Sequence, residues 1–191
     1  MMRRFMLAGA IAWIGALSLS AAADLPTESL YQLPARLTTP RGDTVEWDLH
    51  RGHPTLVSMF YGSCAATCPM LITGVQVYES HLHKASRARL RVLLVSFDAT
   101  RDTPERLAEL ARLHRADPTR WTLTSAPEPD ARRIAALLGV RYRRLPDGDF
   151  DHSLLITLLD GQGRVVASTS KPIGDVEFEA KLRAATASDP G

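Results

Sequence analysis

Cys64 and Cys68 are the side chains of this chain most able to do chemistry, and they are its only two cysteines. Residues four apart on a helical path have Cα atoms about 6 Å apart on one face. That separation permits a disulfide, and it also lets two thiolates bind one metal ion. Closing so short a loop removes little entropy from the unfolded chain, so a purely structural crosslink is the weaker interpretation. The pair therefore indicates thiol exchange or metal binding.

The elements that must position these cysteines alternate between apolar strands and helices. Asp102 or Thr103 can cap a helix that has Pro104 in its first turn, and Gly139 ends a later helix. The predicted elements are a hairpin at 33–49 with a turn at 40–43, strands at 55–60, 91–97 and 121–124, a hairpin of strands at 153–159 and 164–168, and helices at 69–83, 104–114, 129–138 and 175–185. This order predicts an α/β fold of the thioredoxin type, with a central mixed β-sheet flanked by helices and an N-terminal β-hairpin extension.

In that fold the cysteines lie outside the carboxyl end of the strand at 55–60 and at the start of the helix at 69–83. Open α/β sheets bind their ligands at such an edge. A helix N-terminus also favours negative charge, which lowers the pKa of a thiol. The position therefore favours the thiolate, the form that both metal binding and exchange require.

His152 is the third candidate, because it lies just before the predicted strand at 153–159. In a thioredoxin-like sheet the loop before that strand faces the cysteine loop, so the imidazole can complete a Cys2His site. Two soft thiolates and an imidazole suit Cu(I) and can also hold Cu(II), whereas zinc usually needs a fourth ligand. Copper is the favoured metal. Asp151 is a candidate partner for the second imidazole nitrogen.

Other groups near the cysteines have simpler interpretations. Met70 follows Cys68 by two residues and points to a different side of the helix, which predicts core packing. Asp98 ends a predicted strand and either tunes the site or bonds within its own turn. The basic cluster at 141–144 is interpreted first as a solvated face and second as a docking patch for an acidic partner.

The composition is that of one globular domain preceded by an export signal. The chain has 191 residues, of which 45% are hydrophobic and 23% charged, with a formal net charge of +2. Arg3 and Arg4, an apolar run and three alanines are typical of a signal peptide over residues 1–23, with an uncleaved membrane anchor as the alternative. We expect a periplasmic protein with a single domain over 24–191 and a core at about 31–186. Without the two arginines, 21 basic residues balance 21 acidic ones, which gives no case for nucleic acid.

Three separated signatures run from Phe60 to Pro69, from Ser96 to Glu105 and from Asp151 to Ser153. With these signatures the chain resembles the Sco/SenC copper proteins over roughly residues 31–171. The resemblance implies copper held by Cys64, Cys68 and His152. It also implies a metallochaperone that helps to assemble the CuA centre of cytochrome c oxidase.

The resemblance further implies partners. These are the CuA-bearing subunit of the oxidase or another copper acceptor, and other periplasmic copper chaperones or thiol reductases. The chain departs from the family pattern at Ala65 and Ala99, where the family usually has proline. An alanine frees φ and restores an N–H, so the cysteine loop is expected to be less restrained.

An enzymatic role is the alternative to copper delivery. Cys64 and Cys68 would then be the catalytic residues of a thiol-disulfide oxidoreductase that reduces the cysteines of apo-CuA or of another exported client. Such exchange needs both thiols but has no need of His152 as a ligand. The two functions are therefore separable by substitution of the histidine.

Overall fold

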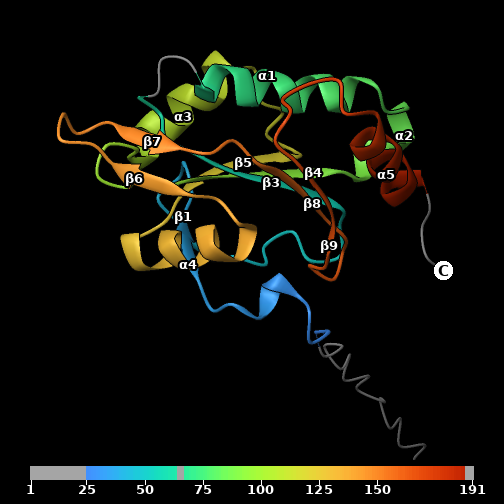
Figure 1. The fold of residues 1–191 in the computed structure, drawn as a ribbon, viewed down its shortest axis with the longest axis horizontal. Coiled ribbons are helices and arrows are strands. Elements are labelled where there is room, and N and C mark those ends of the chain that lie inside the picture. Colours follow the sequence, from blue (N-terminus) through green and yellow to red (C-terminus); the bar gives the residue numbers. More distant parts are fainter. Residues whose placement is uncertain (1–24, 64–66, 188–191) are drawn as a thin grey trace, which may run out of the picture.

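The computed structural model describes residues 25–63 and 67–187, and the side chains of residues 67 and 68 are outside the description (Figure 1). The predicted signal segment at 1–23 and the predicted ligand Cys64 lie outside the described residues. The helices are α1 (Thr67–Ser80), α2 (Lys84–Arg89), α3 (Pro104–Leu113), α4 (Glu128–Leu138) and α5 (Val176–Ala187), with a 3-10 turn at Leu30–Gln32. The strands are β1 (Arg36–Thr38), β2 (Thr44–Glu46), β3 (Thr55–Phe60), β4 (Arg91–Ser96), β5 (Trp121–Ser125), β6 (Tyr142–Arg144), β7 (Phe150–His152), β8 (Ile156–Leu159) and β9 (Val165–Thr169).

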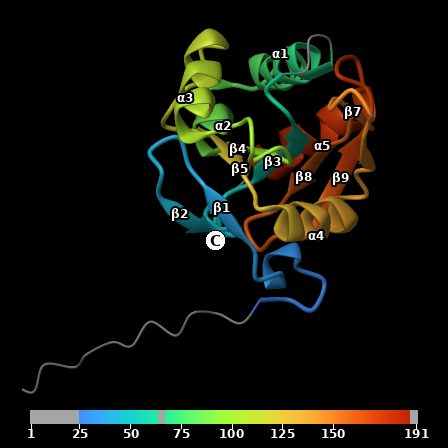
Figure 2. The ribbon, with the colours of Figure 1, turned by 90° about the vertical axis from the view of Figure 1, so that its left-hand side faces the viewer.

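The centre of the molecule is a mixed seven-stranded sheet in the order β2-β1-β5-β4-β3-β8-β9. Strands β3, β4 and β5 are parallel, and the outer neighbours pair antiparallel. Helices α1 and α3 cover one face and α4 covers the other (Figures 1 and 2). Every residue of β3 is buried, as expected for a parallel strand covered on both faces. The predicted thioredoxin-like architecture is confirmed.

The direction of each strand decides which loops meet at one edge of the sheet. The parallel strands β3 and β4 end there, at Phe60 and Ser96. Strand β8 runs the opposite way, with Ile156 opposite Ser58 of β3. The residues before β8 therefore lie at the edge where β3 ends, as the sequence argument about His152 requires.

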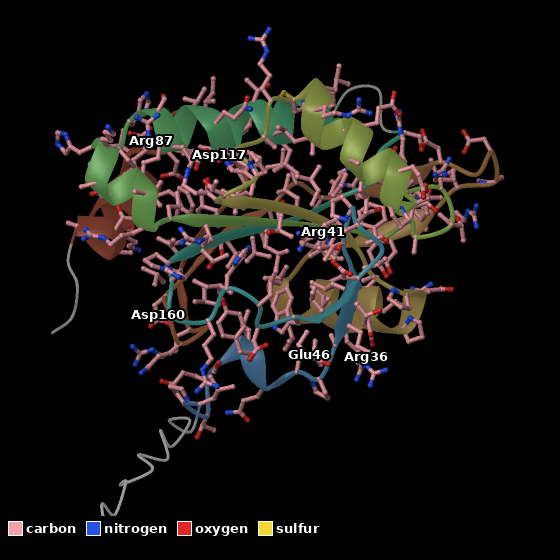
Figure 3. All side chains as sticks on the ribbon, turned by 180° about the vertical axis from the view of Figure 1, so that it is seen from behind. Arg36, Arg41, Glu46, Arg87, Asp117 and Asp160 are labelled. Atoms are coloured by element: carbon pink, nitrogen blue, oxygen red, sulfur yellow. The ribbon has the colours of Figure 1, made fainter. Side chains whose placement is uncertain are left out.

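The N-terminal hairpin of β1 and β2 extends the sheet at one edge. Strand β1 joins β5 through Thr38 opposite Ser125, and the Arg36 N–H donates to Asp130 at 2.9 Å. Arg36 and Glu46 face each other across the hairpin, with side chains 3.9 Å apart and largely exposed (Figure 3). An exposed ion pair of this kind contributes little to stability, so the backbone pairing holds the hairpin.

Local signals explain where two helices begin and end. Of the two candidate caps for α3, Thr103 is the one used, because its hydroxyl accepts the Arg106 N–H. Gly139 ends α4 in the left-handed conformation at φ +73°, where glycine avoids the penalty of a Cβ atom. Both features follow from the sequence.

Three elements differ from the prediction. The helix expected at 69–83 ends at Ser80, and a separate short helix, α2, follows it. Strand β8 begins only at Ile156. The cluster at 141–144 is largely strand β6, which pairs with β7 in a separate two-stranded hairpin. This hairpin carries His152.

His50 makes the stability of the fold depend on pH. Burial, followed by the nearby charges of Arg91 and His53, lowers the pKa of His50 to about 4. The unfolded chain protonates His50 near pH 6.5, while the folded chain resists protonation until about pH 4. As the pH falls through this window the unfolded state binds the extra proton, and the free energy of unfolding should drop by about 3 kcal/mol.

This pH dependence can be measured by urea unfolding of the native chain and of a His50→Gln variant between pH 7 and pH 4. The pKa values of His53 and His114 are lowered by burial as well, so the difference between the two curves isolates the share of His50. The native curve should fall more steeply. Parallel curves would contradict the assignment.

Over the part of the chain that the structure describes, no helix combines the length and apolar character needed to cross a bilayer.

Candidate metal centre

The two ends of the cysteine loop are placed by β3 and α1. Strand β3 ends at Phe60, and Tyr61, Gly62 and Ser63 lead out of the sheet. Cys68 is the second residue of the 14-residue helix α1, as the sequence predicts. The positions of the two sulfur atoms lie outside the description, so their bonding to a metal or to each other stays a prediction.

His152 lies beside the start of this loop. Its ring makes edge contacts with the rings of Tyr61 and Phe97, with both centroid distances 5.5 Å. Tyr61 precedes Cys64 by three residues, and Phe97 directly follows β4. The imidazole is therefore packed against the residues that lead from β3 toward the first cysteine.

The two ring nitrogens of His152 have different surroundings. Nδ1 lies 3.3 Å from the carbonyl oxygen of Ser153. Nε2 is buried and has no hydrogen-bond partner within the described residues. When Nδ1 carries the proton and donates a hydrogen bond to this carbonyl, Nε2 presents a lone pair. This neutral tautomer is the form that binds metals through Nε2. A buried nitrogen without a partner is uncommon, and a metal ion at Nε2 would satisfy it.

The described side chains by themselves do not make a metal site. Among the side chains that the structure describes, no group of three His, Cys, Asp or Glu residues could hold a metal ion. His152 is therefore an isolated donor in the described part of the site. Two thiolates from the adjoining loop are the ligands that this chain can add.

Asp151 does not orient the imidazole, which corrects the expectation for it. Its carboxylate lies 3.3 Å from the guanidinium of Arg143, and both side chains are largely exposed. Successive residues of a strand point to opposite faces, so Asp151 and His152 diverge. The carbonyl of Ser153 takes the predicted role instead.

An aromatic cluster holds the imidazole in place. Its members are Tyr61, Phe97, Tyr142 and Phe150, around His152. The rings of Phe97 and Tyr142 stack with centroids 4.5 Å apart and planes inclined by 12°. The guanidinium of Arg101 lies 5.8 Å from the Tyr61 ring and 5.5 Å from the Phe150 ring. Such packing restricts the rotamers of the histidine.

The sequence reasoning missed this cluster, although a signal for it was present. Tyr61 and Phe97 each come directly after a buried parallel strand. Residues in that position lie together at the ligand-binding edge of an open α/β sheet. An aromatic pair following neighbouring strands therefore predicts an apolar wall beside the site.

Asp98 bonds within its own turn, which settles the choice between its two interpretations. One carboxylate oxygen accepts the hydroxyl of Thr100 at 2.7 Å, and the other pairs with Arg101. The carboxylate thereby fixes the arginine that packs on the aromatic cluster. Asp98 therefore acts on the site by holding Arg101 against the aromatic rings.

Asp102 is another residue near the site that the sequence reasoning did not assign to it. Its side chain is almost fully buried and accepts the N–H of Gly62 at 2.8 Å, together with the hydroxyl of Ser96. Burial raises the pKa of this carboxyl, and the two hydrogen bonds act in the opposite direction. The contact joins residues 40 positions apart, which no local pattern shows.

Met70 is exposed, so the prediction of core packing was wrong. Its relative exposure is 51%, whereas Met59 of β3 is buried. Met70 lies in the first turn of α1, on the side that faces away from the sheet. A soft thioether therefore lies at the surface two residues after Cys68.

Fold and site together define a class of protein. It is a thioredoxin-like protein in which a cysteine loop leaves one central strand and an antiparallel strand brings a histidine to the same edge. The chain belongs to the SCO1/SenC family, whose sequence model matches residues 24–187. The resemblance in the three signatures is thus confirmed.

Solved structures of Sco proteins share this fold. ScoI of Bradyrhizobium japonicum, solved with copper bound, is 26% identical, with a TM-score of 0.63 over 80% of this chain and 97% of that one. ScoI of Arabidopsis thaliana, also with copper bound, is 18% identical, with a TM-score of 0.70 over 80% and 96%. BsSco, described as having a disulfide switch and as a member of the Sco family of cytochrome c oxidase assembly proteins, is 16% identical, with a TM-score of 0.66 over 81% and 92%. No curated protein matches the sequence of this chain.

Proposed function

We propose that this protein binds one copper ion through Cys64, Cys68 and His152 and delivers it to the CuA centre of cytochrome c oxidase during assembly. The observation that carries the proposal is the buried Nε2 of His152, which has no partner within the described residues and lies at the edge where the cysteine loop leaves β3. The donor types fit Cu(I), and also Cu(II). Relatives solved with copper bound support the choice of metal.

Copper is the cargo of this protein, so the site must release it as well as bind it. Three ligands leave room for another donor. An incoming thiolate from the acceptor can bind before one of the protein's thiolates leaves, which lets the ion pass without becoming free. A depression of about 490 Å³, lined by His152 with Arg141, Tyr142 and Asp151 among others, lies beside the hairpin that carries the ring.

The location and partners follow from the same proposal. Residues 1–23 direct export, and the domain over 24–191 works in the periplasm. Its acceptor is the CuA-bearing oxidase subunit. Other periplasmic copper chaperones supply the ion, and thiol reductases keep Cys64 and Cys68 reduced, because only thiolates bind the metal.

Metal analysis of the purified mature protein in its dithiol and disulfide forms tests the proposal. We expect one copper ion per chain in the dithiol form and none in the disulfide form, since oxidation removes two of the three ligands. Equal copper in both forms would show that the sulfurs are not ligands. Absence of copper from both forms would refute the proposal altogether.

Thiol-disulfide exchange is the second candidate function, and the position of Cys68 favours it. The cysteine is the second residue of a long helix, where the helix dipole and the free N–H groups stabilise a thiolate. In that reaction the two thiols of this protein become a disulfide, while the disulfide of a client becomes two thiols. The reaction needs no metal ligand from β7.

A further inference from the structure

Gly62 is held from both of its backbone polar groups. Its N–H donates to Oδ2 of Asp102 at 2.8 Å, and its carbonyl oxygen accepts from Nη2 of Arg106 at 3.3 Å. Gly62 lies two residues before Cys64. The clamp formed by Asp102 and Arg106 therefore acts on the segment that carries the first cysteine out of the sheet.

Asp102 is itself fixed to the end of β4. The hydroxyl of Ser96 donates to the same carboxylate oxygen, and the N–H of Asp98 donates to that hydroxyl at 3.0 Å. The N–H of Asp102 donates to the carbonyl of Asp98 at 2.9 Å. Ser96 and Asp102 are both almost fully buried. The carboxylate is thus a rigid support for Gly62.

The close approach requires a glycine. A Cβ atom at residue 62 would lie 2.3 Å from Oδ1 of Asp102 and 2.6 Å from Cδ1 of Leu110. Both distances are too short for real atoms, so any side chain would push the clamp away. The Asp102 carboxylate packs directly against the backbone of Gly62. Close packing and the hydrogen bond therefore both hold Gly62 in place.

Support at Gly62 matters because the sequence between the two cysteines restricts the backbone little. Residues 65 and 66 are both alanine, so no proline ring restricts φ between the cysteines. Each backbone residue that must be ordered adds an entropic cost to closing the loop. Holding Gly62 in place lowers that cost before either a disulfide or a copper site forms.

We propose that Asp102 and Arg106 are positioning residues for Cys64, and that their clamp on Gly62 makes the disulfide harder to reduce and copper binding tighter. The copper half of this inference rests on the proposed function. The disulfide half does not, because it concerns the protein's own thiols in the absence of metal.

The disulfide half is tested by equilibration with glutathione in the absence of copper. One protein disulfide and two glutathione molecules give one protein dithiol and one glutathione disulfide. We expect Asp102→Ala to shift this equilibrium about tenfold toward the dithiol, because the variant regains the conformational entropy of roughly one backbone residue. A tenfold shift corresponds to about 30 mV for a two-electron couple. Asp102→Asn should restore most of the native value, because an amide oxygen can accept both hydrogen bonds.

Arg106→Gln keeps the inference testable if Asp102→Ala fails to fold. Arg106 is only partly buried on α3, and its loss removes the contact with the Gly62 carbonyl. We expect a shift in the same direction, about threefold, because a side chain–carbonyl bond at this distance is weak. Arg112→Gln is the matched control, since this arginine lies on the same helix and its Nε reaches the Ala108 carbonyl. It should leave the equilibrium unchanged.

Copper affinity of the same variants, measured by competition with a chromophoric Cu(I) chelator, tests the other half. The order of affinities should follow the order of disulfide stabilities. Folded Asp102→Ala and Arg106→Gln proteins with the native glutathione equilibrium would overturn the clamp. A native protein that binds no copper would instead refute the proposed function, while the glutathione measurement would still decide the role of the clamp.

Discussion

Replacing His152 with alanine is expected to weaken copper binding by at least about 100-fold while thiol-disulfide exchange continues. Residues that do not touch a metal but orient one of its ligands already contribute about 10- to 100-fold to metal affinity. Loss of a ligand itself should therefore weaken copper binding by more than that factor. Exchange needs only Cys64 and Cys68. Copper affinity is measured by chelator competition, and exchange by the rate of reduction of a small aromatic disulfide.

The controls separate the two candidate functions. Cys64→Ser and Cys68→Ser should each abolish both copper binding and exchange. His83→Ala should change neither, because His83 is exposed and its side chain makes no capping bond at the start of α2. Native copper affinity in His152→Ala would show that the imidazole is not a ligand. Loss of exchange in the same folded variant would contradict the separation of the two chemistries.

Replacing Glu79 with alanine is expected to lower the free energy of unfolding by about 3 kcal/mol. Glu79 lies on α1 and is 5% exposed. One of its carboxylate oxygens pairs with Arg120, and the other accepts the indole N–H of Trp121 at 2.8 Å. Its removal leaves the indole without an acceptor and takes from Arg120 the more deeply buried of its two carboxylate partners, since Asp117 at 3.0 Å remains. Leaving buried donors without an acceptor costs more than the pair itself contributes. Urea unfolding followed by circular dichroism measures the loss.

Glu46→Ala is the matched control for this prediction. Glu46 also pairs with an arginine, but both partners are largely exposed at the edge hairpin (Figure 3). An exposed pair contributes about 1 kcal/mol or less, so the variant should stay close to the native stability. Equal losses in the two variants would mean that burial does not set the contribution of Glu79.

Much of the fold was predictable because its signals are local. Strand β3 is a continuous apolar run, and its predicted bounds are those of the structure. Pro104 and Gly139 mark the start of α3 and the end of α4 by the φ angles that each residue favours. Alternating strands and helices then leave few topologies, because crossovers between parallel strands have one hand.

The hairpin of β6 and β7 was not predictable in the same way. Its strands have three residues each, and Arg143 and Arg144 of β6 are exposed. No alternation between buried and exposed residues marks so short a strand. The prediction that Met70 packs in the core was wrong for a related reason. Helical spacing shows which residues share a face of a helix, but it does not show which face packs against the rest of the protein.

Three features can be recognised in the chain without knowledge of its fold: two thiols four residues apart, one imidazole far along the chain, and the family to which their motifs belong. The packing of His152 on Tyr61 and the contact of Asp102 with Gly62 appear only in the folded molecule. These contacts depend on the pairing of β3 with β8 and on the path of the chain from β4 into α3. Pairings between segments so far apart are chosen by burial of the whole sheet, whose energy is shared among many residues and is not encoded at any one of them.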